Sequence, residues 1–461
     1  MVNGKGTSKP YVSFVGNSSV DVTGSMHLVR FKKYVTLLDC GLVQLNDPMT
    51  SYKANREQLK KVKPKEIDYI ILSHAHIDHS GLIPALFAKG CQAHVYIPMG
   101  CKGLLKLLWA DSLKIMQSDC LKLERKHGIK APPLYSEDDI NRALDRCIEV
   151  DYYSEYQINP DMTFVYHPAG HIICSAQIEL ILHDNNIVKK IGYTGDIGGG
   201  TTSRPYTRPR KALPFVDILI GENTYNAPTR PNKASDRAKD IEKLYSITET
   251  SNKILIPSFS LQRTQEMLRL LWELGIEVPI YLDSPLSQKI CKIWDNATFQ
   301  QEILTMPNLK QINSWEDSQA LQNSDEHCII LSASGFLNGG RVVAHLKTVL
   351  PDRRNHIVFI GYAGENNLAS QIKSNQKEVV IDGEVVKNLA NITELRSFSS
   401  HANYDELIDY YTNQTRFNKL CLVHGNYNDK VEFSKVLQNK LYNQGKSAKV
   451  VCVNEGTKIY L

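Results

Sequence analysis

Apolar residues in the first part of the chain fall into short runs rich in β-branched residues, a pattern that predicts β-strands. The predicted strands cover residues 11–15, 27–31, 34–39 and 67–73, and Gly24-Ser25 predicts a turn between the first two. Two later patterns have helical spacing, at residues 82–87 and 104–116. In the second of these, an apolar stripe of Leu104, Leu105, Leu107, Leu108 and Ile115 is expected to face the core.

Between about residues 210 and 390, strand-like and helix-like runs alternate. The predicted strands lie at 218–220, 254–256, 280–282, 329–331 and 358–360, and the predicted helices at 234–248, 263–274 and 340–350. Strands that alternate with helices indicate a mostly parallel sheet covered by helices. This part of the chain therefore predicts an α/β domain of its own.

The sequence His-Ala-His-Ile-Asp-His at residues 74–79 directly follows the predicted strand 67–73. Imidazole and carboxylate groups are common zinc ligands, and loops at strand ends commonly carry catalytic groups. A His-rich turn without a metal is the simpler alternative. The hexapeptide alone cannot complete two metal sites, so further ligands are expected at other strand ends.

Three other strand ends carry a residue that can bind a metal. His171 follows the apolar run 163–166, Asp196 follows 188–191, and His424 ends the run 420–423. Each lies beside a glycine, which allows a tight turn, and each taken singly is more often an ordinary turn residue. Four strand ends that all carry His or Asp favour a metal site.

Five further motifs, in this order along the chain, extend the pattern. They are residues 221–225 (Gly-Glu-Asn-Thr-Tyr), 256–266 (Ile-Pro-Ser-Phe-Ser-Leu-Gln-Arg-Thr-Gln-Glu), 282–286 (Leu-Asp-Ser-Pro-Leu), 334–341 (Ser-Gly-Phe-Leu-Asn-Gly-Gly-Arg) and 398–407 (Phe-Ser-Ser-His-Ala-Asn-Tyr-Asp-Glu-Leu). Together with the His and Asp motifs, they make the chain resemble the β-CASP ribonucleases of the metallo-β-lactamase fold. That group includes the cleavage and polyadenylation specificity factor endonuclease and its bacterial and archaeal relatives.

The resemblance implies an α/β fold: a metallo-β-lactamase αββα sandwich interrupted by an inserted α/β β-CASP domain. The expected domains are residues 1–209 and 391–461 for the sandwich and 210–390 for the insertion. A length of 461 residues suits two compact domains. The family has its active site in the cleft between them.

By the same resemblance, the protein is an enzyme that binds two zinc ions per chain. His74, His76 and His171 are expected to hold one ion, Asp78, His79 and His424 the other, and Asp196 to bridge them. The implied reaction is hydrolysis of RNA phosphodiester bonds, with Asp78 in the catalytic site. His401 matches the family's proton donor to the leaving oxygen, and Glu222 matches the carboxylate that pairs with it. An alternative role for His401 is a capping or packing residue before a helix at 404–411.

Charge and composition change this picture only slightly. A net charge of +5 is too weak to argue for nucleic acid by itself, and most basic runs are solvated surface. Arg208, in the basic cluster 204–211, is the preferred contact to the RNA backbone. The loop with Ser334, Gly335, Gly340 and Arg341 precedes a predicted helix, whose free amides suit a phosphate, although an ordinary capped loop explains it nearly as well.

The cysteines and the chain ends bear on location. Ten scattered cysteines without a CxxC pair indicate reduced thiols, and residues 1–10 contain no apolar signal core. No run approaches the ~20 apolar residues of a membrane span. We therefore expect a cytoplasmic protein that does not enter membranes, with RNA as its partner. A homodimer and an RNA-processing complex both stay open.

The chain departs from the family pattern at three places: Gly198-Gly-Gly200, Asn426 and residues 365–370. None is an expected ligand, so the departures put substrate grip in doubt rather than the chemistry. Two other functions stay open: a non-catalytic scaffold subunit of an RNA-processing assembly, and a metallo-hydrolase that acts on DNA or small esters. The sequence does not distinguish endonuclease from 5′-exonuclease cleavage, nor does it identify the target RNA.

Overall fold

The structure is a computed structural model that describes most of the chain. The described residues are 9–45, 47–185, 187–199, 206–228, 234–298, 302–337, 339–361, 367–374 and 376–461. The chain forms two compact units, the first comprising Met1–Pro231 and His401–Leu461 and the second Asn232–Ser400. The second unit is thus an insertion in the sequence of the first.

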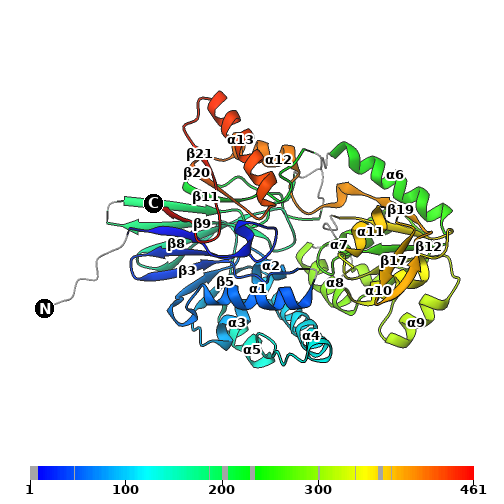
Figure 1. Ribbon diagram of the computed structural model, residues 1–461. Coiled ribbons are helices and arrows are strands. Elements are labelled where there is room, and N and C mark those ends of the chain that lie inside the picture. Colours follow the sequence, from blue (N-terminus) through cyan, green and yellow to red (C-terminus); the bar gives the residue numbers. More distant parts are fainter. Residues whose placement is uncertain are drawn as a thin grey trace. The chain divides into compact units, whose positions relative to one another are not determined.

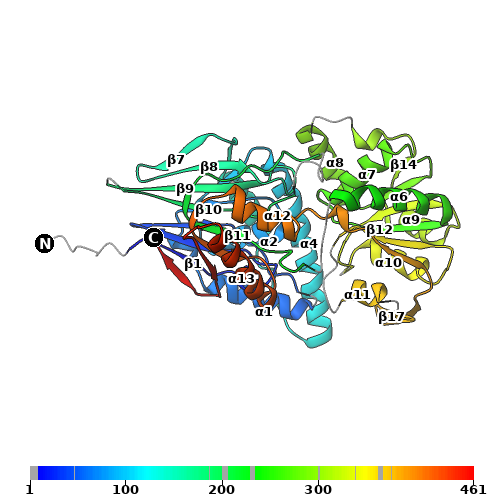
Figure 2. The ribbon, with the colours of Figure 1, turned by 90° about the horizontal axis from the view of Figure 1, so that it is seen from above.

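Two seven-stranded sheets make up the centre of the first unit (Figures 1 and 2). The first sheet has the order β22 (Lys458–Tyr460), β1 (Tyr11–Phe14), β2 (His27–Phe31), β3 (Tyr34–Leu38), β4 (Tyr69–Ile71), β5 (His94–Pro98) and β6 (Cys147–Val150). The second has the order β21 (Lys449–Cys452), β20 (Phe417–Val423), β11 (Val216–Glu222), β10 (Ile187–Tyr193), β9 (Ala176–Asp184), β8 (Met162–Pro168) and β7 (Glu155–Asn159). In each sheet an antiparallel half continues into a parallel half, and β3 pairs with β4, and β10 with β11, in parallel.

The inner faces of these sheets form one hydrophobic core. Phe14, Phe31 and Ile71 of the first sheet pack in the same buried cluster as Phe164 and Ile220 of the second. Such burial of alternate strand positions is the main stabilisation of a sheet sandwich.

Helices cover the outer faces of the two sheets. The helices are α1 (Pro48–Lys60), α2 (Ile77–Ser80), α3 (Ile83–Ala88), α4 (Cys101–His127), α5 (Glu137–Asp145), α12 (Tyr404–Asp409) and α13 (Tyr427–Asn443). Short 3₁₀ turns occur at Asn17–Ser19 and Pro64–Glu66, and a π-helical turn, Tyr410–Gln414, follows α12. Figure 1 shows α12 and α13 on one outer side and α1, α3, α4 and α5 on the other. The expected αββα sandwich is confirmed.

Two local predictions in this unit were wrong. The His-Asp motif does not lie wholly in a loop, because Ile77–Ser80 forms the short helix α2. Ile115 does not belong to the core-facing stripe of α4: its side chain is 56% exposed, whereas Leu104, Leu105 and Leu108 are buried. Ile115 lies on the same helical face as Leu104 and Leu108, but the continuous burial of that face ends at Leu113, and residues 114–122 are partly or fully exposed.

The second unit contains a six-stranded, all-parallel sheet, as the alternating pattern predicts. Its order is β14 (Leu309–Gln311), β13 (Ile280–Asp283), β15 (Cys328–Ser332), β12 (Lys253–Pro257), β16 (His356–Phe359) and β19 (Asn391–Glu394). A separate hairpin consists of β17 (Glu378–Ile381) and β18 (Glu384–Lys387). The helices are α6 (Ala234–Thr250), α7 (Arg263–Glu273), α8 (Pro285–Thr298), α9 (Trp315–Asn323), α10 (Arg341–Val349) and α11 (Leu368–Lys373), with 3₁₀ turns at Ile303–Thr305 and Arg396–Phe398.

The strand at 218–220 does not join this parallel sheet, although its pattern resembles the strands that do. In the structure it is β11, which pairs with β10 and β20 in the first unit. β19 pairs with β16 and belongs to the second unit. The boundaries between the units therefore fall at Pro231 and Ser400, whereas the sequence-based domains change at residues 210 and 391. Among the described residues, no helix combines the length and the apolar character that a bilayer span requires.

Candidate metal centre

The residues expected to bind metal come from the ends of strands in both sheets of the first unit. His74 and His76 follow β4, and Asp78 and His79 lie in α2 directly after them. The remaining three lie after strands of the second sheet: His171 between β8 and β9, Asp196 after β10 and His424 directly after β20. β8, β10 and β20 run in the same direction, because β8 and β10 both pair antiparallel with β9, and β10 and β20 both pair parallel with β11. Their ends therefore lie at the same edge of the second sheet.

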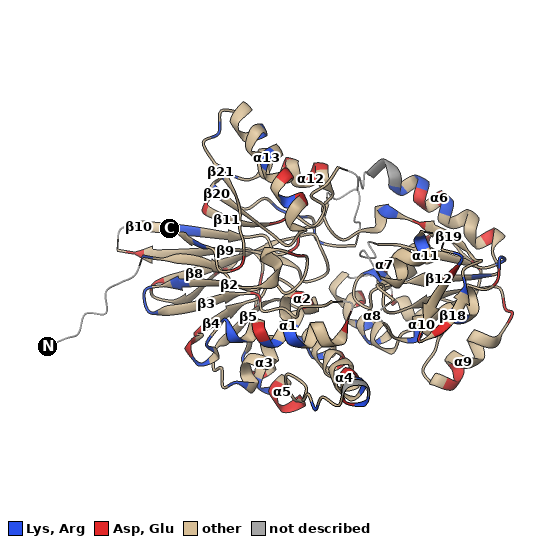
Figure 3. Ribbon diagram, in the orientation of Figure 1, with Lys and Arg blue, Asp and Glu red and all other residues tan. Residues whose placement is uncertain are grey.

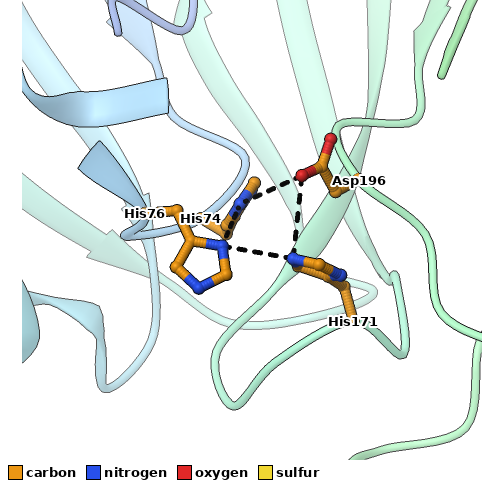
Figure 4. A group of neighbouring side chains, drawn as sticks. All are labelled: His74, His76, His171 and Asp196. Carbon is orange, nitrogen blue, oxygen red and sulfur yellow. Dashed lines mark hydrogen bonds and ion pairs between the residues drawn. The ribbon is translucent and has the colours of Figure 1, made fainter. Parts of the chain in front are cut away.

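The first group of donor atoms contains three imidazoles and one carboxylate oxygen (Figure 4). His76 Nδ1 lies 3.1 Å from His74 Nε2 and 3.2 Å from His171 Nε2. Asp196 Oδ2 lies 3.7 Å from His74 Nε2 and 3.6 Å from His171 Nε2. Four donors placed tetrahedrally about 2.1 Å from one zinc ion are roughly 3.4 Å apart, so the spacing suits zinc.

The second group contains Asp78, His79, His424 and, again, Asp196. His79 Nε2 lies 3.3 Å from His424 Nε2 and 3.3 Å from Asp196 Oδ1. Asp78 Oδ2 lies 3.3 Å from His424 Nε2 and 3.7 Å from His79 Nε2. This group also has the spacing of ligands around one small cation.

Asp196 connects the two groups because its two carboxylate oxygens face different ways. Oδ2 faces the first group and Oδ1 the second. Oδ1 is buried and has no hydrogen-bond partner among the described residues. A buried carboxylate oxygen without a hydrogen bond is costly unless a cation compensates it, so Asp196 fits a carboxylate shared by two metal ions.

A buried aspartate that the sequence analysis missed orients two of the imidazoles. Asp39 Oδ2 accepts a hydrogen bond from His79 Nδ1 at 2.6 Å and one from Ser73 Oγ at 2.6 Å. Ser73 Oγ in turn lies 3.0 Å from His74 Nδ1. Since the Ser73 proton is directed to Asp39, its oxygen accepts from His74, and the Nε2 atoms of both imidazoles keep their lone pairs for the donor groups.

Thr224 orients His424 in a similar way. Its hydroxyl donates to the carbonyl oxygen of His424 at 3.3 Å and lies 2.9 Å from His424 Nδ1. The hydroxyl oxygen therefore accepts the Nδ1 proton, and His424 Nε2 faces Asp78 as a lone-pair donor. Sequence reasoning assigned no role to Asp39, Ser73 or Thr224. The available signal was a polar residue at a strand end, with Asp39 directly after β3 and Ser73 shortly after β4.

Burial and neighbouring charges set the protonation of the cluster. Burial lowers the pKa of His74 and His171 well below the ordinary value and that of His76 to about 4, so these imidazoles are neutral near pH 7. Burial also acts to lower the pKa of His79, but the carboxylates of Asp196 and Asp78 outweigh it and raise the pKa. For Asp196 burial acts to raise the pKa, and the imidazoles of His424 and His79 hold it well below the ordinary value.

Close backbone packing holds the segments that carry these residues. A Cβ atom at Gly41 would lie 1.6 Å from the carbonyl oxygen of Asp78, and one at Gly198 would lie 1.7 Å from that of Gly170, next to His171. Both glycines therefore allow a contact that no other residue permits. Gly198, one of the departures from the family pattern, has this structural reason, while Gly200 lies outside the described residues.

Glu222 and His401 form a pair next to the two groups of donor atoms. His401 Nδ1 lies 3.2 Å from Glu222 Oε1. Glu222 is completely buried, and its carboxylate accepts hydrogen bonds from the backbone N–H of Ile197 at 2.8 Å and of Thr224 at 3.1 Å. His401 is not the N-cap of α12, because Asn403 has that position. The ring of His401 lies 4.6 Å from that of His171.

The residues expected to contact substrate lie in both units. Arg208 is exposed in the first unit, with its guanidinium 5.0 Å from the centre of the Tyr152 ring. Ser334 and Gly335 follow β15 in the second unit, and Gly340 is the N-cap of α10. Arg341 Nη1 forms an ion pair with the buried Asp283 at 2.6 Å, so part of its guanidinium is used within the fold.

The two other departures from the family pattern lie at helix starts. Asn426 caps α13 by accepting a hydrogen bond from the N–H of Asn428 at 3.0 Å. Asn367 caps α11 in a reciprocal pair with Ser370, while Glu365 and Asn366 lie outside the described residues. Each described departure thus has a local structural role.

Comparisons with known proteins agree with this architecture. Residues 20–119 match the metallo-beta-lactamase superfamily and residues 264–372 match the Beta-Casp domain. Residues 386–449, which include His401 and His424, match the Zn-dependent metallo-hydrolase RNA specificity domain.

Relatives that match most of this chain have three different names. The chain is 30% identical to ribonuclease TTHA0252 of Thermus thermophilus, covering 90% of this chain and 94% of that protein. It is 30% identical to an RNase J-like protein of Methanocaldococcus jannaschii, over 90% of this chain and 92% of the other. It is 29% identical to the transcription termination factor FttA of the same organism, over 93% of this chain and 68% of that protein. A crystal structure of a protein of unknown function from Enterococcus faecalis has the same fold, with a TM-score of 0.54 at 14% identity over 98% of this chain and 100% of that one.

Proposed function

The chain belongs to the β-CASP family of the metallo-β-lactamase superfamily, and from this premise we propose that it is a zinc-dependent ribonuclease. The proposed reaction is the hydrolysis of RNA phosphodiester bonds in RNA processing or decay. Cleavage within the RNA and cleavage from its 5′ end are both compatible with this site.

One observation carries the proposal: two groups of mostly buried donor residues share Asp196. We assign His74, His76 and His171 to one zinc ion and Asp78, His79 and His424 to the other. The nitrogen and carboxylate donor set, without a thiolate, suits a hydrolytic zinc site. A zinc pair, when bound, supplies Lewis acidity that polarises a phosphoryl oxygen and acidifies a water molecule.

The protein's own groups prepare this site and complete the reaction. Asp39 and Thr224 fix the imidazole tautomers so that the lone pairs point inward. Glu222 accepts a hydrogen bond from His401 Nδ1, which leaves Nε2 of the imidazolium to donate a proton. His401 is the general acid of the proposal, because the leaving 3′ oxygen needs a proton and the side chain is 20% exposed to incoming substrate.

RNA is the favoured substrate for two reasons. Two whole-length relatives are named a ribonuclease and an RNase J-like protein, and the match to the RNA specificity domain covers His401 and His424. Figure 3 shows positive and negative residues interspersed in both units, so affinity for RNA has to come from local groups. Arg208, Ser334, Gly335, Gly340 and Arg341 are the proposed contacts.

The proposal also includes a location and an assembly. All ten cysteines are free thiols, which suits the reducing cytoplasm. A homodimer or an RNA-processing complex stays a prediction for the assembly.

Cleavage of end-labelled RNA tests the function. Single-stranded RNAs labelled at the 5′ or the 3′ end are incubated with the purified protein, with and without a zinc chelator. We expect cleavage that the chelator abolishes and added zinc restores, and the product ladders separate internal from end-directed cleavage. Zinc-loaded protein that leaves both RNAs intact would overturn the proposal.

Two substitutions test the assigned roles. We expect Asp78→Ala and His401→Ala each to reduce the cleavage rate at least about 100-fold, because one removes a zinc ligand and the other the general acid. Only Asp78→Ala should lower the zinc content. His94→Ala, at an exposed histidine of β5, is the control and should retain both rate and zinc. Full zinc content in Asp78→Ala, or full activity in His401→Ala, contradicts the corresponding role.

A further inference from the structure

Two phenylalanine rings lie together at the carboxyl ends of two strands of the second unit. Phe259 follows β12 and Phe336 follows β15, and their ring centres are 4.8 Å apart in an edge-to-face arrangement. Both side chains are only partly buried. Neither belongs to the hydrophobic core cluster of this unit, although the neighbouring Leu337 and Phe359 do. Core packing therefore does not explain the pair.

The backbone around the two rings is built to keep them in place. Ser334, Gly335, Phe336 and Leu337 form a turn in which the N–H of Leu337 donates to the carbonyl oxygen of Ser334 at 3.2 Å. Leu337 is buried and anchors the turn, which leaves Phe336 at its tip. A Cβ at Gly335 would lie 3.2 Å from the Phe259 ring, so a glycine allows that ring to pack directly on the turn.

The other ring is fixed from its own loop. Thr264, in the first turn of α7, donates from its hydroxyl to the carbonyl oxygen of Phe259 at 2.8 Å and is itself 2.8 Å from the hydroxyl of Ser258. Ser258 N–H donates to the carbonyl oxygen of Ser332 at 3.0 Å, which ties the loop after β12 to the end of β15. Two rings held this firmly form a preorganised surface.

The position in the sheet is one where ligands commonly bind. β12 and β15 are adjacent; the chain continues from β12 to β13, which lies beyond β15, and from β15 to β16, which lies beyond β12, so the two connections run in opposite directions along the sheet. In open α/β sheets, ligands bind outside the carboxyl ends of the strands, at a point where the order of the strands reverses. A hollow lies there, lined by Ser258, Phe259, Arg263, Gly335 and Phe359.

We propose that Phe259 and Phe336 form a stacking subsite for one nucleobase of single-stranded RNA. This inference rests on the proposed ribonuclease function and names a part of its substrate recognition. A phenylalanine ring offers a flat apolar face without hydrogen-bonding groups, so it stacks on any base.

Kinetics with single-stranded RNA give the first test. We expect Phe336→Leu to raise KM about tenfold and to change kcat less than twofold, because stacking contributes to binding and not to the chemistry; this lies within the range of base–aromatic stacking. Phe336→Trp, which keeps a flat aromatic face, should restore KM to within about threefold. Tyr245→Leu removes a 47% exposed aromatic ring from α6 and is the matched control, with KM unchanged. Melting temperatures confirm that each variant is folded.

Oligonucleotides with one missing base separate stacking from other contacts. A series in which an abasic nucleotide occupies each position in turn is used as competing inhibitors. For the wild type, one position should weaken inhibition about tenfold, and for Phe336→Leu the same position should have no effect. A variant that equals the wild type in KM, or that stays sensitive to the abasic position, overturns the subsite while RNA cleavage itself persists. Absence of any RNA cleavage by the wild type instead overturns the proposed function.

Discussion

Asp39 organises the candidate metal centre although it is not a member of either donor group that contains Asp196. One carboxylate oxygen accepts hydrogen bonds from His79, from Ser73 and from the hydroxyl of Tyr193, the last at 2.7 Å. Through His79 directly and through Ser73 to His74, it orients one imidazole in each group. A side chain that fixes ligand orientation commonly affects metal affinity by 10- to 100-fold.

We therefore predict that Asp39→Asn weakens zinc binding about 10- to 100-fold without unfolding the protein. The neutral amide is a poorer acceptor for His79 and cannot satisfy both His79 and Ser73 equally. Zinc affinity, measured by competition with a fluorescent chelator, checks the expectation. Tyr193→Phe, which removes only one hydrogen bond to Asp39, should have an effect smaller than about threefold. Equal affinities of Asp39→Asn and wild type would show that the orientation of these imidazoles does not matter.

The strand-end histidines and aspartates could be predicted from the sequence, whereas the residues behind them could not. His74 to His79, His171, Asp196 and His424 stand in short motifs beside apolar runs, and the structure brings them together. Asp39 forms its contacts with residues 34, 40 and 154 positions away. Such a hydrogen-bond network has no sequence periodicity, so only the folded structure reveals it. The roles of the assembled residues as zinc ligands remain predictions.

Helix α8 and strand β13 carry buried carboxylates with opposite dependence on pH. Burial raises the pKa of Asp295 in α8 to about 6, although the carboxylate accepts a hydrogen bond from the N–H of Ile303 at 3.0 Å. At the end of β13, burial acts to raise the pKa of Asp283, but hydrogen bonds from His345, Ser318 and Arg341 hold it below the ordinary value.

We predict that Asp295→Asn stabilises the protein by about 1–3 kcal/mol above pH 6 and has no effect below about pH 4. The folded state binds the Asp295 proton more tightly than the unfolded state, whose carboxyl has a pKa of 3.8. The wild type therefore loses stability as the pH rises from 3.8 to about 6, and the amide does not. Chemical denaturation between pH 4 and pH 8 measures this difference.

Asp283→Asn is the contrasting variant in the same unit. In the wild type, the folded-state pKa of Asp283 is lowered. The stability that its carboxylate contributes is therefore present above pH 3.8 and is lost as the pH falls through the folded-state pKa. We expect this variant to be destabilised by about 3–5 kcal/mol at pH 7, because His345 and Arg341 lose a buried partner. A stability gain for Asp295→Asn that does not change with pH would contradict the account of α8.

Elements with strong periodicity could be predicted, and elements that depend on tertiary contacts could not. The strands at 27–31 and 254–256 and the helix at 263–274 appear close to their predicted positions. Helix α2 lies between His76, a proposed zinc ligand, and Gly81, and its four residues are too few to display a periodic pattern. Ile115 shows the converse limit, since helical spacing predicts which face of α4 is apolar but not how far along the helix that face is buried.

At the scale of the whole molecule, the insertion was predictable but its borders were not. The motifs at 398–407 and 420–425 return to the first unit after the parallel sheet of the second, and this order indicates an interrupted domain. An apolar strand pattern does not specify which sheet the strand joins. β11 pairs with β20, which lies about 200 positions later in the sequence, and only that pairing assigns it to the first unit.

Anomalous X-ray scattering at the zinc edge, from crystals of the zinc-loaded protein, tests the central claim most directly. We predict two anomalous peaks next to Asp196, one enclosed by His74, His76 and His171 and the other by Asp78, His79 and His424. Zinc-loaded crystals without a peak beside Asp196, or with zinc bound only elsewhere, would contradict the two-metal centre and the hydrolysis assigned to it.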